Sequence, residues 1–411
     1  MTTKKAATRR FLNKQEACRR FPAHKVEDLD AHILKTDSLA DRVVDGFAQL
    51  PGGRGWKLLE QALVSGIDAV PDAPPELVAL FEHVDHVPDW VDWDQLERGA
   101  IAYWRSGFFT GLALQCASLA AGYQSSSAIM PLIITGRLVA RAERRKQETG
   151  RWVLQASRPG GMRRFEQGFA YTVRVRLVHA FVRRKLMQMP EWDYQAWGAP
   201  INLTDTSYGI CGEFSSVAID AIEKCGVLYS DQERADIYAL WRYVGHVLGI
   251  PHRLLPVDEE DALERMAIKE LTDTRADDNS RELVRGLIEH GGDDIDEMPR
   301  LLRTIITQER LIGFLYGQVR YFAGDSLADE LGAPDTAYKH ILRLSKPLVR
   351  FFDTRRQRSE DREKAERFLT LGWRMLDDKA ASAELASEES LSRDIAKRRS
   401  LLRRNLRPRA A

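Results

Sequence analysis

The sequence has no apolar run of the length that a membrane-spanning helix needs, which is about 18 to 20 residues. The nearest candidate, Phe108 to Tyr123, is interrupted by Thr110, Gln115 and Ser118 and is rich in glycine and alanine. This composition is typical of a helix that is buried inside a protein against close neighbours. We therefore expect no transmembrane span.

The sequence also lacks an excess of either charge, because 61 Lys and Arg residues face 60 Asp and Glu residues, for a net charge of +1. Net charge thus gives no support for a nucleic-acid partner or for an acidic membrane as a partner. The four cysteines lie far apart and form no CxxC pair, which argues against a zinc site or a disulfide framework and favours a reducing compartment. They are Cys18, Cys116, Cys211 and Cys225.

A complete export signal is missing from the N-terminal residues. The segment Thr8-Arg9-Arg10-Phe11-Leu12 is close to a twin-arginine signal, but residues 13–20 that follow contain no apolar stretch. We therefore interpret the first residues as a basic arm and expect a cytoplasmic protein.

Strand-like alternation is absent, while apolar residues recur with helical spacing from near Asp28 onwards. We predict an all-α fold with one large helical domain over 28–355, which a basic arm over 1–27 precedes and a charged helical tail over 356–411 follows. The tail ends in a cluster of arginines and is interpreted as solvated. The alternative is that it makes a peripheral contact with a membrane or an acidic partner.

Local signals predict the bounds of three central helices. We expect a helix over 126–149 that Gly150 follows, a helix over 161–189 that Pro190 closes, and a helix over 201–225 that Thr204 or Asp205 caps.

The helix over 161–189 carries His179, with Arg176 and Arg183 one turn to either side on the same mostly apolar face. A buried imidazole can ligate a metal through one ring nitrogen, and guanidinium groups offer paired donors to carboxylates. A haem requires this set, an axial nitrogen and cations for its two propionates. The alternative is a core histidine beside two solvated arginines, and spacing alone leaves both interpretations open.

Four segments follow one another in an order that points to a known family. They are Leu112-Ala113-Leu114-Gln115-Cys116-Ala117 with Ala120-Ala121-Gly122, then Arg145-Lys146-Gln147-Glu148-Thr149, then the run from Arg176 through His179 to Arg183, and finally Pro200 to Asp205 with Trp241 to Gly249. In these motifs the sequence, over about 55–330, resembles the bacterial latex clearing protein (rubber oxygenase) and MpaB-type oxygenase family.

The resemblance implies a globin-like helical core that binds one haem b, and an oxidoreductase that adds dioxygen to carbon–carbon double bonds of an apolar substrate. It implies that His179 is the proximal iron ligand and thus the metal-binding residue. Arg145 and Thr149 would lie on the helix that covers the other face of the haem. Arg176 and Arg183 would support the haem or its propionates.

Two positions depart from the family pattern. Glu148 stands where rubber oxygenases have a lysine that binds iron in a closed state, and a carboxylate there would change the charge and potential of the iron. We expect an open distal site, or Glu148 acting as a base beside Arg145 and Thr149. Ile129 stands at the spacing of the family's proposed proton-abstracting glutamate and cannot do acid–base chemistry. We therefore expect an isoprenoid or fatty substrate other than rubber.

Two rival functions remain open, a non-catalytic haem-binding sensor or carrier and a cofactor-free helical scaffold. The other candidate polar residues have structural interpretations. We expect a hydrogen-bonded core histidine at His246, an exposed pair at His83 and His86, a helix cap or a partner of the His179 ring at Asp205, and a buried carboxylate paired with an arginine at Glu213.

Overall fold

The computed structural model describes residues 8–135, 148–291 and 306–358, and every regular element within these ranges is a helix. The all-α prediction is therefore confirmed. The α-helices are α1 (Lys14–Arg20), α2 (Ala23–His32), α3 (Ser38–Phe47), α4 (Arg54–Ser65), α5 (Pro75–Asp85), α6 (Trp93–Trp104), α7 (Phe108–Ala113), α8 (Ala120–Gly122), α9 (Met130–Thr135), α11 (Gln167–Met187), α12 (Tyr194–Trp197), α13 (Leu203–Tyr208), α14 (Ala218–Lys224), α15 (Asp231–Val247), α16 (Glu259–Thr272), α17 (Asp278–Gly291), α19 (Gln308–Ala323), α20 (Asp325–Glu330) and α21 (Lys339–Arg358).

Two of the remaining helical segments are π-helices, η3 (Leu114–Leu119) and η4 (Gly209–Val217), and each continues an α-helix on both sides. Three short 3₁₀ segments complete the set, η1 (Pro51–Gly53), η2 (Ile67–Ala69) and η5 (His252–Leu254). A π-helical turn inside an α-helix is uncommon and often marks a functional region.

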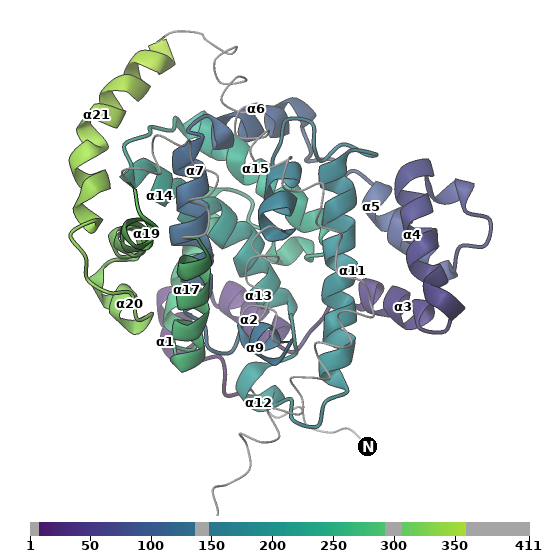
Figure 1. The fold of residues 1–411 in the computed structure, drawn as a ribbon. Coiled ribbons are helices and arrows are strands. Elements are labelled where there is room, and N and C mark those ends of the chain that lie inside the picture. Colours follow the sequence, from purple (N-terminus) through teal and green to yellow (C-terminus); the bar gives the residue numbers. More distant parts are fainter. Residues whose placement is uncertain (1–7, 136–147, 292–305, 359–411) are drawn as a thin grey trace, which may run out of the picture.

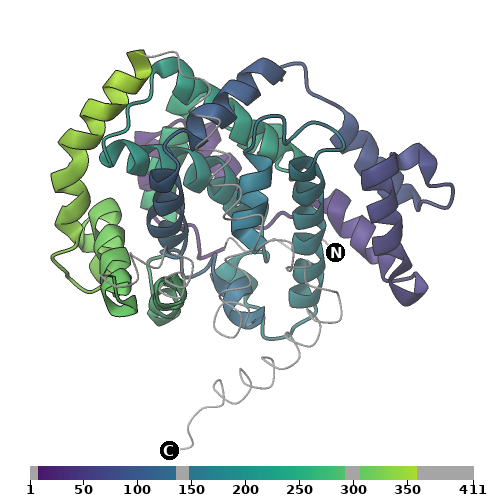
Figure 2. The same ribbon diagram turned by 45° about the horizontal axis from the view of Figure 1, so that its top comes forward.

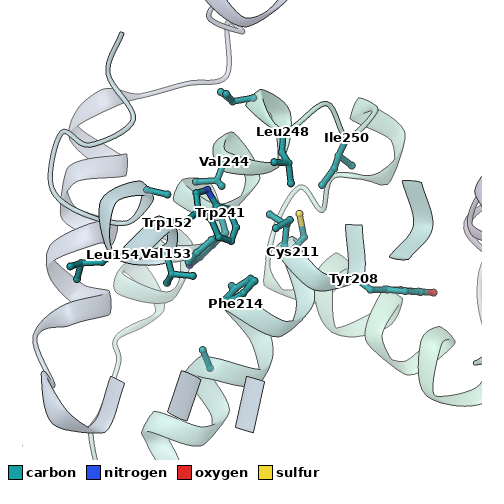
Figure 3. Close-up of a cluster of buried hydrophobic side chains, with 14 of the residues drawn as sticks. Trp152, Val153, Leu154, Tyr208, Cys211, Phe214, Trp241, Val244, Leu248 and Ile250 are labelled. Atoms are coloured by element: carbon teal, nitrogen blue, oxygen red, sulfur yellow. The ribbon is translucent and has the colours of Figure 1, made fainter. Parts of the chain in front are cut away.

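The centre of the molecule is a cluster of aromatic side chains around Trp241 of α15, which is fully buried. Its ring stacks on that of Phe214 from η4 at a centroid distance of 5.1 Å, and Trp152 lies edge-on to both rings at 5.6 and 6.1 Å (Figure 3). Aromatic pairs in such geometries add to the free energy of simple burial. The cluster thus joins α15, η4 and the helical residues 148–156 into one core.

Helix α11 stands between this core and a flank made of α3, α4 and α5, while α19, α20 and α21 lie at the opposite edge of the molecule (Figure 1). The same order is seen after rotation (Figure 2). Helix α11 packs against α3 on one side and against α9 and α15 on others.

Residues 8–20 lie in the predicted basic arm, but they pack onto the body of the protein. The Leu12 amide donates to the Thr272 carbonyl at 2.8 Å, and the Arg10 side chain is buried against Asp205. The first helix begins at Lys14, earlier than the helical pattern that we expected from near Asp28. An arginine paired with a buried carboxylate explains why a polar segment docks here.

Three predicted boundaries are wrong. Gly150 does not end a helix, because residues 148–156 are helical around it. Helix α11 begins at Gln167 and not near Gly161, since the chain first turns through Gly160 and Phe165, both with positive φ. The cap of α13 is Asn202, whose side-chain oxygen accepts from the Asp205 amide at 2.9 Å, so neither Thr204 nor Asp205 is the capping residue.

Candidate functional site

Helix α11 and the helical residues 148–156 form an antiparallel hairpin. The Trp152 indole N–H donates to the Thr172 hydroxyl at 3.1 Å, and three residues further along, Gln155 lies beside Gly168. A Cβ atom on Gly168 would lie only 2.2 Å from the Gln155 carbonyl oxygen, so this approach requires glycine. The two helices are therefore locked together at the end where the chain turns.

The other end of the hairpin is packed less tightly. His179, Val175 and Val178 of α11 are half-buried, whereas Thr172 and Val173 one or two turns earlier are buried. The facing helix shows the same trend, because Trp152 and Val153 are buried while Glu148 and Thr149 are half-buried. Since Trp152 lies opposite Thr172, antiparallel pairing places Thr149 opposite Val175, one turn from His179.

The predicted site residues are thus brought together in part. Glu148 and Thr149 lie at the same end of the hairpin as His179, while Arg145 lies outside the described residues. The stripe of α11 that includes Val175, Val178 and His179 is apolar apart from the imidazole. Such a stripe suits a flat apolar group with a metal at its centre better than it suits a polar ligand.

Arg176 and Arg183 point towards α3 and meet carboxylates there. Arg176 forms a two-pronged ion pair with Asp37, at 2.6 and 3.1 Å, and donates to the Val247 carbonyl. Arg183 Nε donates to Asp41 at 2.7 Å, and its Nη1 donates to the Ile201 carbonyl. Both arginines are buried, so these contacts fix the rotation of α11 about its axis and with it the direction of His179.

Burial alone would raise the pKa of Asp37, but the Arg176 guanidinium outweighs it and holds the pKa below its ordinary value. Asp37 also caps α3 by accepting from the Ala40 amide. The negative charge of Asp37 is therefore a fixed part of the α3–α11 interface.

Glu213 is a site residue whose environment differs from the one that the sequence suggested. It lies on the π-helix η4, and Gly122 makes room for its carboxyl group, because a Cβ atom there would be 2.6 Å from Glu213 Oε2. Within the described ranges no ion pair or hydrogen bond joins this carboxyl to another side chain, although we expected an arginine partner. Burial raises the pKa of Glu213 to about 7, despite the opposing effect of Lys269.

The polar groups around the two π-helices are satisfied in part. The Ser118 hydroxyl of η3 donates to the Glu213 carbonyl at 2.7 Å, and the Tyr103 hydroxyl donates to the Phe214 carbonyl at 2.8 Å, so backbone oxygens of η4 are satisfied from outside the helix. Gln115 of η3 has a buried Nε2 for which the described residues offer no hydrogen-bond partner. Only the positions of Gln115 and Glu213 in apolar stretches could have signalled these features in the sequence.

Asp205 lies in a buried polar cluster. Its carboxylate accepts two hydrogen bonds from Arg10, one of them at 2.7 Å, and another from Asn202 at 2.7 Å. Burial raises the pKa of Asp205, and Arg10 offsets this only in part. Arg10 and Asn202 thus supply hydrogen bonds to the Asp205 carboxylate, and the His179 ring is not among these partners.

His83 of α5 and His246 of α15 form a pair that the sequence did not indicate. Their ring centroids are 5.0 Å apart, and Trp90 and Tyr243 lie against the His246 ring. Burial, with a further contribution from His83, lowers the pKa of His246 to about 4. Among the described residues, no group of three or more His, Cys, Asp and Glu side chains is arranged to hold a metal ion.

Comparison with known proteins gives the family. Residues 104–354 match the family model for the catalytic domain described as ER-bound oxygenase mpaB/B'/Rubber oxygenase. The chain belongs to this family. It is therefore related to oxygenases, and the resemblance inferred from the four sequence motifs is confirmed.

Two relatives give the extent of the similarity. The chain is 24% identical over 213 residues to the rubber oxygenase of Streptomyces sp. (strain K30), which covers 49% of this chain and 48% of that protein. The chain thus spans about half the length of this relative. Its fold matches the structure of latex clearing protein LCP in the closed state with a TM-score of 0.52 and 19% identity, over 88% of both chains.

Two further findings concern this family member. Ile129, at the spacing of the family's glutamate, is buried in the apolar core. In the described part of the chain, no helix combines the length and apolar character needed to cross a membrane.

Proposed function

We propose that this chain is a haem b-dependent oxygenase that acts with dioxygen on an apolar unsaturated substrate of the isoprenoid or fatty class. The observation that carries the proposal is the position of His179. His179 is half-buried and shares a side of α11 with Val175 and Val178, at the end of the hairpin where the side chains are less buried and where Thr149 lies on the facing helix.

The residues around His179 fit a haem. Its iron needs one neutral imidazole nitrogen, and the pattern of half-buried side chains at Val175 and Val178 is what a flat apolar group would cover. The haem, when bound, supplies the redox chemistry with dioxygen. The chain supplies the iron ligand, the orientation of the substrate and the exclusion of water.

We assign roles to the other candidates on the same basis. Arg176 and Arg183 support the haem by holding α11 against α3, because their guanidinium groups are taken up by Asp37 and Asp41. Thr149, Glu148 and Arg145 would contact the opposite side of the haem. Glu148 would there act as a base or leave the iron accessible to dioxygen, since a carboxylate replaces the lysine of the rubber oxygenases.

The proposed substrate class rests on the apolar helix that packs beside α11. This helix is α9, which contributes Leu132 and Ile133, both half-buried. A site lined in this way favours a hydrocarbon chain. Because Ile129 carries no acid–base group, we propose a substrate other than rubber, though polyisoprenoid-like in chemistry.

The test is an absorption spectrum of the purified protein after haem supplementation. We expect a Soret band in the wild type, its loss or a marked shift in His179→Ala, and no change in His340→Ala, which removes an exposed histidine of α21. A wild-type protein that takes up no haem would end the proposal. Oxygen consumption with unsaturated isoprenoids and fatty acids then separates an oxygenase from a haem carrier.

A further inference from the structure

Helix α21 exposes an apolar stripe. Five large side chains, spaced so that they share one side of the helix, are strongly exposed: Ile341 at 42%, Leu344 at 78%, Leu348 at 60%, Phe351 at 54% and Phe352 at 61%. Elsewhere in the described chain, exposed large apolar residues are scattered. Contiguous exposed apolar surface is rare on soluble proteins and marks an interaction site.

The stripe faces away from the body because the other side of α21 is anchored. Leu342 is buried, and the Asp353 carboxylate accepts from the Leu228 amide at 2.9 Å and lies 3.8 Å from Arg105. The helix packs on α19 and α14 and forms the outer edge of the molecule in both views (Figures 1 and 2). The stripe therefore lies on the outer surface of the molecule.

The charges on α21 indicate what the stripe would contact. Arg343, Arg350 and Arg355 are exposed beside the stripe, whereas Asp353, the one acidic residue of the helix, is buried on the anchored side. A second copy of this stripe would bring cations against cations. A lipid surface offers an apolar layer beneath anionic headgroups, which complements both the stripe and the arginines.

We propose that α21 docks this chain flat on an anionic lipid surface, with the stripe of Ile341, Leu344, Leu348, Phe351 and Phe352 inserted among the acyl chains. This contact is separate from the arginine cluster of the C-terminal tail. It does not depend on haem binding or on oxygenase activity.

The test is vesicle flotation of the full chain with phosphatidylcholine alone or mixed with phosphatidylserine. We expect binding to the mixed vesicles. The affinity should fall by about tenfold or more in Leu344→Ser/Leu348→Ser, because this variant removes two leucine side chains that would be buried among the acyl chains. Val64→Ser/Val257→Ser is the matched control, since these residues are 72% and 59% exposed away from α21, and it should bind normally. Arg343→Glu/Arg350→Glu should weaken binding to the mixed vesicles. Circular dichroism melting verifies that each variant is folded.

Three outcomes would overturn the proposal. Binding that survives the leucine variant but is lost in Arg403→Glu/Arg404→Glu would assign the membrane contact to the tail. A dimer in analytical ultracentrifugation that the leucine variant abolishes would assign the stripe to a second copy of the chain. A full chain that neither binds vesicles nor associates would show that the stripe is covered within the chain itself.

Discussion

Two interfaces within the protein differ in whether their ionisable side chains are paired. Between α3 and α11, Arg176 and Arg183 meet Asp37 and Asp41, so each buried cation has a carboxylate. Between the π-helices η3 and η4, Glu213 has no ion-pair partner among the described residues, and Gln115 Nε2 has no partner either. The first interface also sets the orientation of α11, and the second lies between two π-helical segments.

This difference distinguishes residues that stabilise the fold from residues that keep hydrogen-bonding capacity for a ligand. A paired buried charge stabilises one arrangement and leaves no free hydrogen-bonding capacity for a ligand. An unpaired carboxyl beside a glycine costs stability but keeps a proton that is exchangeable near neutral pH. The arginines that flank His179 in the sequence thus hold α11 against α3. Of the two unsatisfied polar groups, Gln115 lies within a sequence motif and Glu213 lies outside the motifs.

The largest effect is expected from breaking the paired interface at its centre. Arg176→Met leaves the Asp37 carboxylate buried without its cation, and such a change costs about 3–5 kcal/mol of unfolding free energy. Urea denaturation followed by circular dichroism measures it. A loss below about 1 kcal/mol would mean that Asp37 finds another partner or water, as an exposed pair does.

A substitution at the interface between η3 and η4 should raise the free energy of unfolding, whereas Arg176→Met lowers it. The pKa of Glu213 is raised from 4.5 to about 7, so the folded state keeps a proton that the unfolded chain releases, and stability falls as pH rises through that range. Glu213→Gln should therefore stabilise the protein at pH 8, by up to about 3 kcal/mol, and have little effect near pH 4. Denaturation at the two pH values tests this. A stabilisation that is equal at both values would show that ionisation is not the cause.

The pH dependence of stability in the acid range tests the paired interface through Asp37. Because the pKa of Asp37 is lowered in the folded state, its contribution is present above the unfolded value of 3.8 and is lost as pH falls through the folded pKa. Asp37→Asn keeps the helix cap but removes this titration. We expect the variant to be less stable than the wild type at pH 7, with a gap that narrows below pH 4 in melting experiments. A constant gap would contradict the ion-pair explanation.

Much of the fold could be predicted because its signals are local. Asp92 caps α6 and Ser230 caps α15, as polar residues ahead of apolar periodicity suggest. Gly150 was expected to end a helix but lies inside one, since glycine also occurs in helix interiors. Gly168 is required by a close approach to Gln155 that only the tertiary structure shows. The π-helices leave no distinctive pattern, because segments of six and nine residues contain too few turns for their period to be told from that of an α-helix.

The sequence predicted which candidate site residues share a helix, but not the residues distant in sequence that contact them. Spacing placed Arg176, His179 and Arg183 on neighbouring positions of one helix, but it gave no access to Asp37 and Asp41, which are more than a hundred residues away in sequence. The pairing of His83 with His246 was missed for the same reason. Helical spacing predicts which residues share a face of a helix, but it does not predict which residues of other helices pack against that face.

The smallest effect should come from the exposed end of the same interface. Arg184 pairs with Asp45 at 2.7 Å, continuing the series of Asp37 and Asp41, but the two side chains are 27% and 65% exposed. Solvent screens this pair, so Arg184→Met should cost no more than about 1 kcal/mol in the urea titration used for Arg176→Met. If both substitutions cost the same, burial is not what distinguishes the pairs, and the α3–α11 interface would have to be understood as one cooperative charge network.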